Sequence, residues 1–488
     1  MVARHCIHRG IQSFRCTKRF SVYNSISSFC STPLNHTDDP AERHEGEVLV
    51  SIDRSNLSTA PEHSPEKKAE ESPMVKHIKS MIRFRGGPIT LADYMEEVLT
   101  NPTAGFYINR DVFGAEGDFI TSPDVSQMFG ELVGIWSLCL WQQMGQPKEV
   151  NVVELGPGRG TLMADFLRGV SKFKDFANAI SVHLVECSPT LRTIQQKTLR
   201  VSMEEQHQST TTTENSPAEG MVDAFKRTAS TLFNSNITWH ADLEQVPCGV
   251  PTIIIAHEFF DALPIHQFQK SSRGWSEKLV DVDESSELGL RFVLSPGPTA
   301  ASKLYLAKRF KWASLEEKES LNHAEVCPQA LKLTHEIAKR VGRDSGGALI
   351  IDYGEEKLVS DSLQAIQKHK FVNVLHNPGD ADLSAYVDFA ALKHVVKESS
   401  VDAEVFGPIT QSAFLGMLGI NFRVEALLER AKDDKQAELL KSGYWRLVGD
   451  GSAPWWEGEE TLAPIGMGSR YKVLAIVKSG LGTPQCFQ

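Results

Sequence analysis

The sequence lacks the features that would mark a membrane, metal-bound or nucleic-acid-binding protein. No apolar run approaches the roughly 18–20 residues that a membrane-spanning helix needs. The eight cysteines form no CxxC pair and have irregular spacing, so neither structural zinc nor a disulfide framework is supported. A formal net charge of −11 disfavours a general nucleic-acid binder. The remaining possibility is a globular chain, 488 residues long, with one large domain and appendages.

Acidic residues are absent from positions 1–37. This stretch is rich in serine and has no apolar core of the kind that a secretory signal requires. We therefore expect an organelle transit peptide over 1–37, which the family resemblance described below implies to be mitochondrial, with a disordered basic tail as the alternative. Residues 38–75 are polar with four prolines, which predicts a disordered linker. The basic residues of the first segment are Arg4, Arg9, Arg15, Lys18 and Arg19.

Residues 76–149 are predicted to form an N-terminal helical extension. The segment GPITLADYMEEVLTNP (87–102) has helical apolar spacing and ends at an Asn-Pro pair. A second helix is expected from Pro123 onward, with Ser122 as its cap. The segment GDFITSPDVSQ (117–127) is a candidate lid, although a plain packing loop fits equally well.

From 150 to 478 the pattern of apolar strand, turn and helix repeats. It predicts an α/β fold with a parallel sheet covered on both faces. We expect an insertion at 265–345 that begins with hairpin strands, a solvated insertion at 202–220, and a helical pair at 411–430. The last strand is expected at 469–478, followed by a tail at 479–488.

The first strand of this pattern leads into the turn VVELGPGRG (152–160). Gly156, Gly158 and Gly160 allow a tight turn and close approach of a ligand. The GxGxG spacing differs from the dinucleotide fingerprint GxGxxG, and Glu154 would face a phosphate poorly. An acidic residue at position 154 suits S-adenosylmethionine, because this ligand carries an ammonium, a sulfonium and ribose hydroxyls and has no phosphate. The alternative is a turn with a purely structural role.

Two further acids follow the next strands. Glu186 ends the second strand, where a carboxylate can accept hydrogen bonds from both ribose hydroxyls. Asp242 ends the third, where it can meet the adenine amino group, although aspartates are common in turns. We predict that both residues bind the cofactor.

The fourth strand ends in the segment HEFFD (257–261). It resembles the zinc motif HExxH but lacks the second histidine and follows a buried strand, so we predict no metal site. Glu258 and Asp261 are the candidate catalytic residues, because a guanidinium acceptor needs carboxylates to hold the cation and help remove a proton. The alternative is that Glu258 caps a helix or pairs locally while Asp261 faces solvent. Asp352 and Tyr353, at the end of the next strand, are secondary candidates.

Together these segments resemble the MidA-type class I methyltransferase family, and within it the protein-arginine methyltransferases that assist mitochondrial complex I assembly. The resemblance covers about 83–478. The stretches that carry it are GPITLADYMEEVLTNP, GDFITSPDVSQMFGELVGIW, VVELGPGRGTL, ISVHLVECSP, AHEFFDALPIHQFQK, HAEVCP, GGALIIDYG and PGDADLSAYVDF.

The resemblance implies a Rossmann-like seven-stranded sheet, S-adenosylmethionine as cofactor and the glycine turn as its binding site. It also implies symmetric dimethylation of an arginine in a core subunit of respiratory complex I, in the mitochondrial matrix. The segment SAPWWEGEETLAP (452–464) departs from the family pattern. Two alternatives stay open: an assembly chaperone that binds the cofactor without essential catalysis, and a methyltransferase with a different acceptor atom. The oligomeric state is not readable from the sequence.

Overall fold

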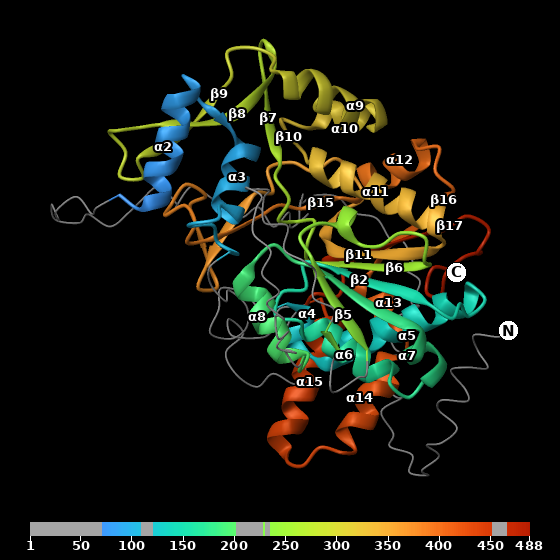
Figure 1. The fold of residues 1–488 in the computed structure, drawn as a ribbon. Helices are drawn as coiled ribbons and strands as arrows, with labels where there is room; N and C mark the ends of the chain where they lie inside the picture. The colour runs from blue at the N-terminus through green and yellow to red at the C-terminus, as the bar shows by residue number, and fades with distance from the viewer. Residues whose placement is uncertain (1–70, 109–120, 202–227, 230–234, 451–465) are drawn as a thin grey trace, which may run out of the picture. The chain divides into compact units, whose positions relative to one another are not determined.

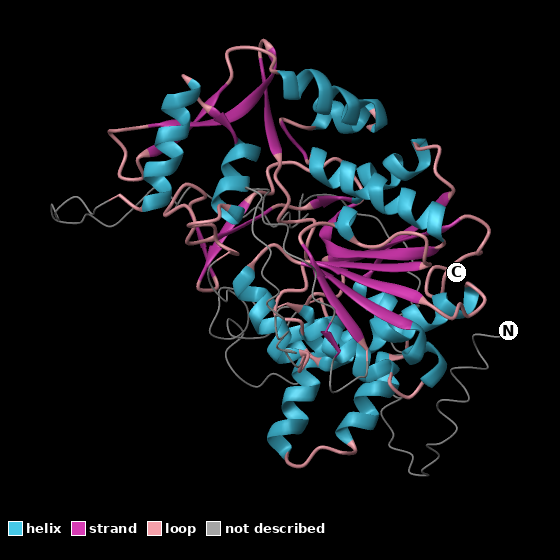
Figure 2. Cartoon of the chain, in the orientation of Figure 1, coloured by secondary structure: helices cyan, strands magenta, loops and turns pink. Residues whose placement is uncertain are grey.

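The computed structural model describes residues 71–108, 121–201, 228–229, 235–450 and 466–488. Its central feature is a sheet of nine strands in the order β16-β17-β11-β6-β2-β3-β5-β4, with β15 pairing with β11 (Figures 1 and 2). The strands are β2 (Val150–Leu155), β3 (Ile180–Val185), β4 (Thr228–Ala229), β5 (Asn236–His240), β6 (Thr252–His257), β11 (Gly346–Glu355), β15 (Val387–Asp388), β16 (Ala403–Thr410) and β17 (Tyr471–Lys478).

Seven of these strands form the body of the sheet, as the family resemblance implied. Strands β5, β3, β2, β6 and β11 are parallel neighbours, whereas β17 is antiparallel to both β11 and β16. The other two strands, β4 and β15, have two residues each and lie at the margin. Because β17 runs in reverse, its first residue, Tyr471, lies at the same edge as the carboxyl ends of the parallel strands.

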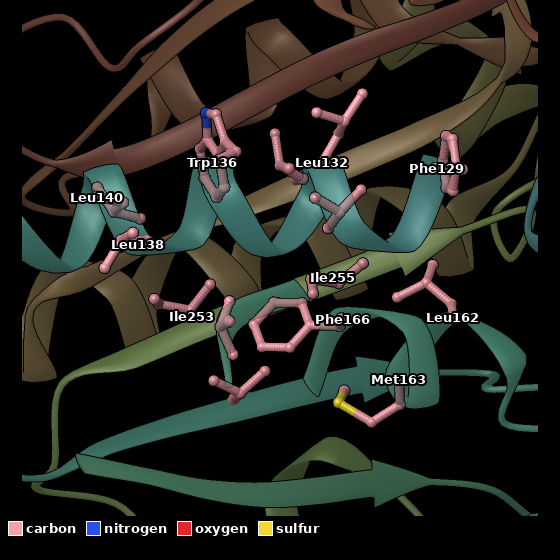
Figure 3. Close-up of a cluster of buried hydrophobic side chains, with 14 of the residues drawn as sticks. Phe129, Leu132, Trp136, Leu138, Leu140, Leu162, Met163, Phe166, Ile253 and Ile255 are labelled. Atoms are coloured by element: carbon pink, nitrogen blue, oxygen red, sulfur yellow. The ribbon is translucent and has the colours of Figure 1, made fainter. Parts of the chain in front are cut away.

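Helices cover both faces of the sheet, as expected for a parallel sheet of continuous apolar strands. On one face, α5 and α6 pack their large side chains against alternate residues of β2 and β6 (Figure 3). On the other face, α11 and α12 cover the remaining alternate residues. The covering helices are α5 (Gln127–Gln143), α6 (Thr161–Val170), α7 (Lys174–Ala179), α13 (Gln411–Met417), α14 (Ile420–Leu428) and α15 (Asp434–Val448) on the first face, and α11 (Pro328–Asp344) and α12 (Phe389–Glu398) on the second.

The N-terminal extension and the insertion form a second layer with a core of their own. Strand β1 (Ile89–Thr90) pairs with β8 (Gly274–Val282) of the insertion. This sheet, in the order β1-β8-β7-β10 with β9 beside β8, packs on α2 (Pro73–Arg85) and α3 (Leu91–Thr100). Its other strands are β7 (His266–Ser271), β9 (Leu290–Leu294) and β10 (His323–Val326). The predicted hairpin strands and the helix at 87–102 are therefore confirmed.

The remaining elements are short. A third sheet has the order β13-β12-β14 and contributes to the core beneath α3. Its strands are β12 (Gln364–Gln367), β13 (Lys370–Val372) and β14 (Asp382–Ser384). The other helical segments are α4 (Ser122–Val125), α8 (Pro189–Thr198), η2 (Leu243–Gln245), η3 (Ser302–Leu306), α9 (Ala307–Trp312) and α10 (Leu315–Ser320). In the described ranges no helix has the length and apolar character needed to cross a membrane.

Three expected boundaries differ from the structure. The expected linker to residue 75 runs into α2, which begins at Pro73 because the Ser72 side chain accepts a hydrogen bond from the Val75 amide. The expected insertion to 345 includes α11, which packs on the central sheet. Ser122 does not cap one continuous helix: the chain is extended at Ser126, and that residue caps α5 through the Met128 amide.

The predicted pair of helices at 411–430 and the last strand at 469–478 are confirmed as α13, α14 and β17. Several other predictions fall outside the described residues. These are the transit peptide at 1–37, the linker up to residue 70, the insertion at 202–220, the segment 452–464 and the first part of the candidate lid.

Candidate active site

The glycine turn follows β2 at the carboxyl edge of the sheet. Gly156, Gly158 and Gly160 all have positive φ, at 60°, 50° and 80°, a region that residues with a Cβ rarely adopt. A Cβ on Gly156 would also lie 2.6 Å from Cδ2 of Phe259. The turn itself therefore favours glycine at all three positions, and the tight packing against the HEFFD segment also requires it at Gly156.

Glu154 lies buried at the end of β2, with only 3% of its surface exposed. Its Oε2 atom is buried without a hydrogen-bond partner. Burial, together with the nearby charge of Glu186, raises the pKa of Glu154 to about 8. A buried carboxylate with an unpaired oxygen suits a cationic or hydroxyl-bearing ligand, because such a ligand would supply the missing donor.

Glu186 is linked to the glycine turn by a residue that the sequence analysis did not single out. Gln195, fully buried on α8, donates from Nε2 to the Gly158 carbonyl at 2.8 Å and to Glu186 Oε2 at 3.1 Å. Its Oε1 accepts from the Trp239 indole at 2.8 Å. Glu186 Oε1 accepts from the Ser188 amide at 2.8 Å. Each oxygen of Glu186 keeps lone pairs for further donors, such as ribose hydroxyls.

Asp242 has a different local environment from the other predicted cofactor ligands. It is exposed, and its carboxylate caps η2 by accepting from the Gln245 amide at 3.1 Å. The residue is not among those that line the cavities beside the glycine turn. Its proposed contact with adenine stays a prediction, and the structure supplies a capping role that explains the aspartate by itself.

Glu258 occupies an unusual backbone position directly after β6. Its φ is 47°, the left-handed region that non-glycine residues seldom adopt. The amide of Glu258 donates to the Ile351 carbonyl at 3.0 Å, and Oε1 accepts from the Ser122 amide at 3.3 Å. The Tyr471 hydroxyl also donates to this carboxylate. Burial and the charge of Asp261 hold the pKa of Glu258 well above its ordinary value.

Asp352 fixes the loop that carries both candidate catalytic acids. Its Oδ2 accepts from three consecutive amides, those of Phe259, Phe260 and Asp261, at 3.2, 3.0 and 3.3 Å. Asp352 is completely buried, and burial raises the pKa of its carboxyl well above the ordinary value. We infer that this residue orients the loop rather than touching an acceptor.

Asp261 is buried in the same cluster. The Tyr353 hydroxyl donates to its Oδ2 at 2.6 Å, while Oδ1 is buried without a partner. Burial raises the pKa of Asp261 above its ordinary value. In the described part of the chain, neither Glu258 nor Asp261 pairs with a lysine or arginine; the one ion-pair contact is His257 Nε2, 3.3 Å from Glu258 Oε1. Burial lowers the pKa of His257 to about 3, so this histidine supplies no positive charge near neutral pH.

A cavity of 470 Å³ brings these residues together. Gly156, Gly158 and Glu186 line it together with Glu258, Asp261 and Tyr353. Glu154 lines a small adjoining space of 40 Å³ that shares Gly156, Gly158 and Glu258 with the larger cavity. Gly160 lines neither space and instead sits at the start of α6. The predicted cofactor turn and the predicted catalytic acids thus meet in one place.

Three tyrosines of this cavity, Tyr107, Tyr386 and Tyr471, were not singled out from the sequence. Tyr386 and Tyr471 flank Tyr353 edge-on, with ring centroids 5.5 and 5.6 Å from its ring. Tyr471 is the first residue of β17, and it lies at this edge of the sheet only because β17 runs antiparallel to the other central strands. No periodicity or motif in the sequence marks that reversal. In the residues that the structure describes, no group of three or more His, Cys, Asp or Glu could hold a metal ion.

The fold and the cavity are those of an enzyme that binds a nucleoside-type cofactor at the carboxyl edge of its first strands. Residues 132–409 match the model of a family described as S-adenosyl-L-methionine-dependent methyltransferases. The chain belongs to this methyltransferase family, and S-adenosylmethionine is the cofactor on which the family depends.

Similar proteins agree with this assignment. Proteins named protein arginine methyltransferase NDUFAF7, mitochondrial, are 40% identical in Mus musculus, over 79% of this chain and 83% of that protein, and 39% identical in Homo sapiens, over 77% and 80%. A protein from Burkholderia thailandensis, whose crystal structure holds bound S-adenosyl-homocysteine, has a TM-score of 0.63. It is 21% identical and covers 88% of this chain and 98% of that one, which supports the fold.

The residues present fit S-adenosylmethionine. Glu154 offers a buried, unpartnered carboxylate oxygen for a cation or hydroxyl. Glu186 lines the larger cavity with free acceptor capacity, and no phosphate-binding cation is required by this ligand. The glycine turn leaves Gly156 and Gly158 facing both spaces.

Proposed function

We propose that the protein is a mitochondrial-matrix protein-arginine methyltransferase that symmetrically dimethylates an arginine in a core subunit of respiratory complex I and thereby supports assembly of the complex. The relatives named as mitochondrial arginine methyltransferases support the acceptor and the compartment. The basic, acid-free composition of residues 1–37 agrees with import into mitochondria.

One observation carries the choice of a guanidinium acceptor. Glu258 and Asp261 both line the cavity, yet neither has a lysine or arginine partner in the described part of the chain. Asp261 is buried and the Glu258 side chain is only 11% exposed. Two carboxylates so far withdrawn from water without a counter-charge are costly, and their raised pKa values express that cost. A guanidinium between them would supply both the missing charge and hydrogen-bond donors in a fixed planar arrangement.

The protein's own residues would act mainly by positioning and electrostatics. Bound S-adenosylmethionine supplies an electrophilic methyl group on a sulfonium. Glu154 and Glu186 would hold the cofactor beside the two acids. Glu258 holds the guanidinium and localises its charge away from one nitrogen. As that nitrogen forms its bond to the methyl carbon, the bond between this carbon and sulfur would break with its electron pair left on sulfur. The nitrogen would lose a proton, which Asp261 would accept at Oδ1, the oxygen without a hydrogen-bond partner. Correct orientation alone can contribute roughly 7–11 kcal/mol to such a step.

The direct test is mass spectrometry of complex I subunits after incubation with the purified protein and deuterium-labelled S-adenosylmethionine. The proposal predicts labelled methyl groups on an arginine, with one methyl on each terminal nitrogen of a dimethylated product. A labelled methyl group on a residue other than arginine would show that the acceptor is that residue and not arginine. No label despite measurable cofactor binding would favour the assembly chaperone.

A further inference from the structure

The mouth of the cavity carries two exposed aromatic side chains. The described residues include ten exposed large hydrophobic side chains, and of these only Phe371 and Tyr386 line the cavity. Phe371 is 64% exposed and Tyr386 is 38% exposed. Exposed aromatic residues beside a concave site are typical of recognition surfaces, because they offer large contact areas at a low entropic cost.

Tyr386 connects this mouth to the catalytic acids through a chain of contacts. Its ring lies edge-on to Tyr353, with centroids 5.5 Å apart, and the Tyr353 hydroxyl donates to Asp261 at 2.6 Å. An arginine side chain that reaches Asp261 from outside would therefore pass along the tyrosine rings. Its aliphatic stem and its planar cation both interact favourably with aromatic faces.

Phe371 forms a separate apolar contact point at the same mouth. It lies on β13, at the edge of the three-stranded sheet, opposite Ile366 of β12. Ile366 lines the cavity as well, and Met95 and Leu99 of α3 add an apolar wall. Because Phe371 is exposed whereas Asp261 is buried, this surface is available to a side chain next to the acceptor rather than to the acceptor itself.

The acidic lining of the cavity favours a positively charged occupant. Its ionisable lining residues among those described are five acids and one base, Arg470. A cationic segment complements this lining, whereas an acidic one would be repelled. The acids are Glu96, Glu186, Glu258, Asp261 and Asp382.

We propose that the mouth formed by Phe371 and Tyr386 binds the polypeptide segment that carries the acceptor arginine, with Tyr386 against the arginine side chain and Phe371 against an apolar side chain beside it. This proposal rests on the proposed arginine methyltransferase function and adds a sequence preference to it: the substrate segment has an apolar residue next to the target arginine.

The test uses fluorescein-labelled nonapeptides with one central arginine in a Gly/Ser background, flanked either by leucines or by serines. Binding to the full chain is measured by fluorescence anisotropy with S-adenosyl-homocysteine present, so that no methyl transfer is needed. We expect the wild type to bind the leucine-flanked peptide about tenfold more tightly. In Phe371→Ser this preference should fall below about twofold.

Phe84→Ser is the matched control, because Phe84 is 94% exposed on α2 and does not line the cavity. It should keep the wild-type preference, and both variants should melt at the wild-type temperature. Equal binding of the two peptides by the wild type, or an unchanged preference in Phe371→Ser, would overturn the proposal. A third peptide with citrulline in place of arginine separates the two levels of inference. If leucine flanks are preferred but citrulline binds as well as arginine, the guanidinium acceptor fails and the apolar contact at the mouth stands.

Discussion

The Tyr353 hydroxyl donates a hydrogen bond to Asp261 Oδ2 at 2.6 Å, and this contact leaves the other oxygen of the carboxylate buried without a partner. The tyrosine thus fixes which oxygen of Asp261 can meet an acceptor. Both residues line the cavity beside the glycine turn. The orientation of the Asp261 carboxylate therefore depends on a side chain 92 residues further along the chain.

Replacing Tyr353 by phenylalanine should therefore slow methyl transfer without weakening cofactor binding. We expect the rate at saturating cofactor to fall by roughly 10–100-fold, since small misplacements of a reacting group have effects of that size. The measurement is the single-turnover transfer rate beside calorimetric cofactor affinity. Tyr444→Phe is the control: its hydroxyl bonds to Asn421 at an exposed site away from the cavity. A wild-type transfer rate in Tyr353→Phe would show that the hydrogen bond from Tyr353 is not needed to orient Asp261 for methyl transfer.

Gln195 should matter for the cofactor site beyond its contribution to stability. Gln195→Met leaves the Gly158 carbonyl, Glu186 Oε2 and the Trp239 indole without their partner. We expect about 2 kcal/mol lower unfolding free energy and at least tenfold weaker cofactor binding. Gln411→Met is the matched control, because Gln411 is equally buried and bonds to the Leu447 carbonyl. If both variants lose stability and neither loses cofactor affinity, Gln195 is only a core residue.

Gly156→Ala should destabilise the protein and abolish cofactor binding. The new Cβ would meet Phe259 at 2.6 Å in a backbone region with φ of 60°, and the two effects together cost about 2–4 kcal/mol. Gly145→Ala separates them, because Gly145 has φ of 84° and open space around its Cβ position. That control should lose about 1 kcal/mol, measured by denaturant unfolding, and keep its cofactor affinity. Equal losses in both variants would show that packing against Phe259 is unimportant.

The stability of the ligand-free protein should fall as the pH rises from about 5 to 8. Glu154 has a folded-state pKa of about 8, above its ordinary value of 4.5. Between these values the folded protein holds a proton that the unfolded chain has released, so stability is full below the lower value and declines as pH rises through the window. The slope is about 1.4 kcal/mol per pH unit for one proton.

Urea unfolding at a series of pH values checks this sign, and Glu154→Gln should remove that part of the slope. Bound S-adenosylmethionine should stabilise the protein more at pH 8 than at pH 6, because Glu154 is then ionised and can meet a donor or cation. Two results would contradict the raised pKa of Glu154 in the folded protein. One is a wild-type stability that rises with pH over this window, and the other is an unchanged slope in Glu154→Gln.

The elements with strong local signals could be predicted from the sequence. The helix at Leu91–Thr100 begins at Thr90, which forms a capping box with Asp93, and it ends before the Asn101-Pro102 pair. The glycine turn and the strand that precedes it were likewise marked by three glycines at alternate positions and by an apolar run.

Features that depend on distant contacts could not be predicted. The break between α4 and α5 lies at Ser126, where the chain is extended and the side chain caps the next helix. At the start of α4 the Ser122 amide bonds to Glu258, 136 residues away. Asp352 appeared as a possible catalytic residue because it ends a strand. Its role as an acceptor for three loop amides follows only from the parallel pairing of β11 with β6.

The central claim is that Glu258 holds a guanidinium in line with the methyl group of the cofactor. Its most direct test is the transfer of a deuterated methyl group to arginine by the wild type and by Glu258→Gln, at saturating cofactor, with cofactor affinity measured in parallel. The account predicts that the variant binds the cofactor within about threefold of the wild type and transfers methyl at least 100-fold more slowly, since the interaction lost acts in the transition state. Full transfer to arginine by Glu258→Gln, with wild-type affinity for the acceptor, would contradict it.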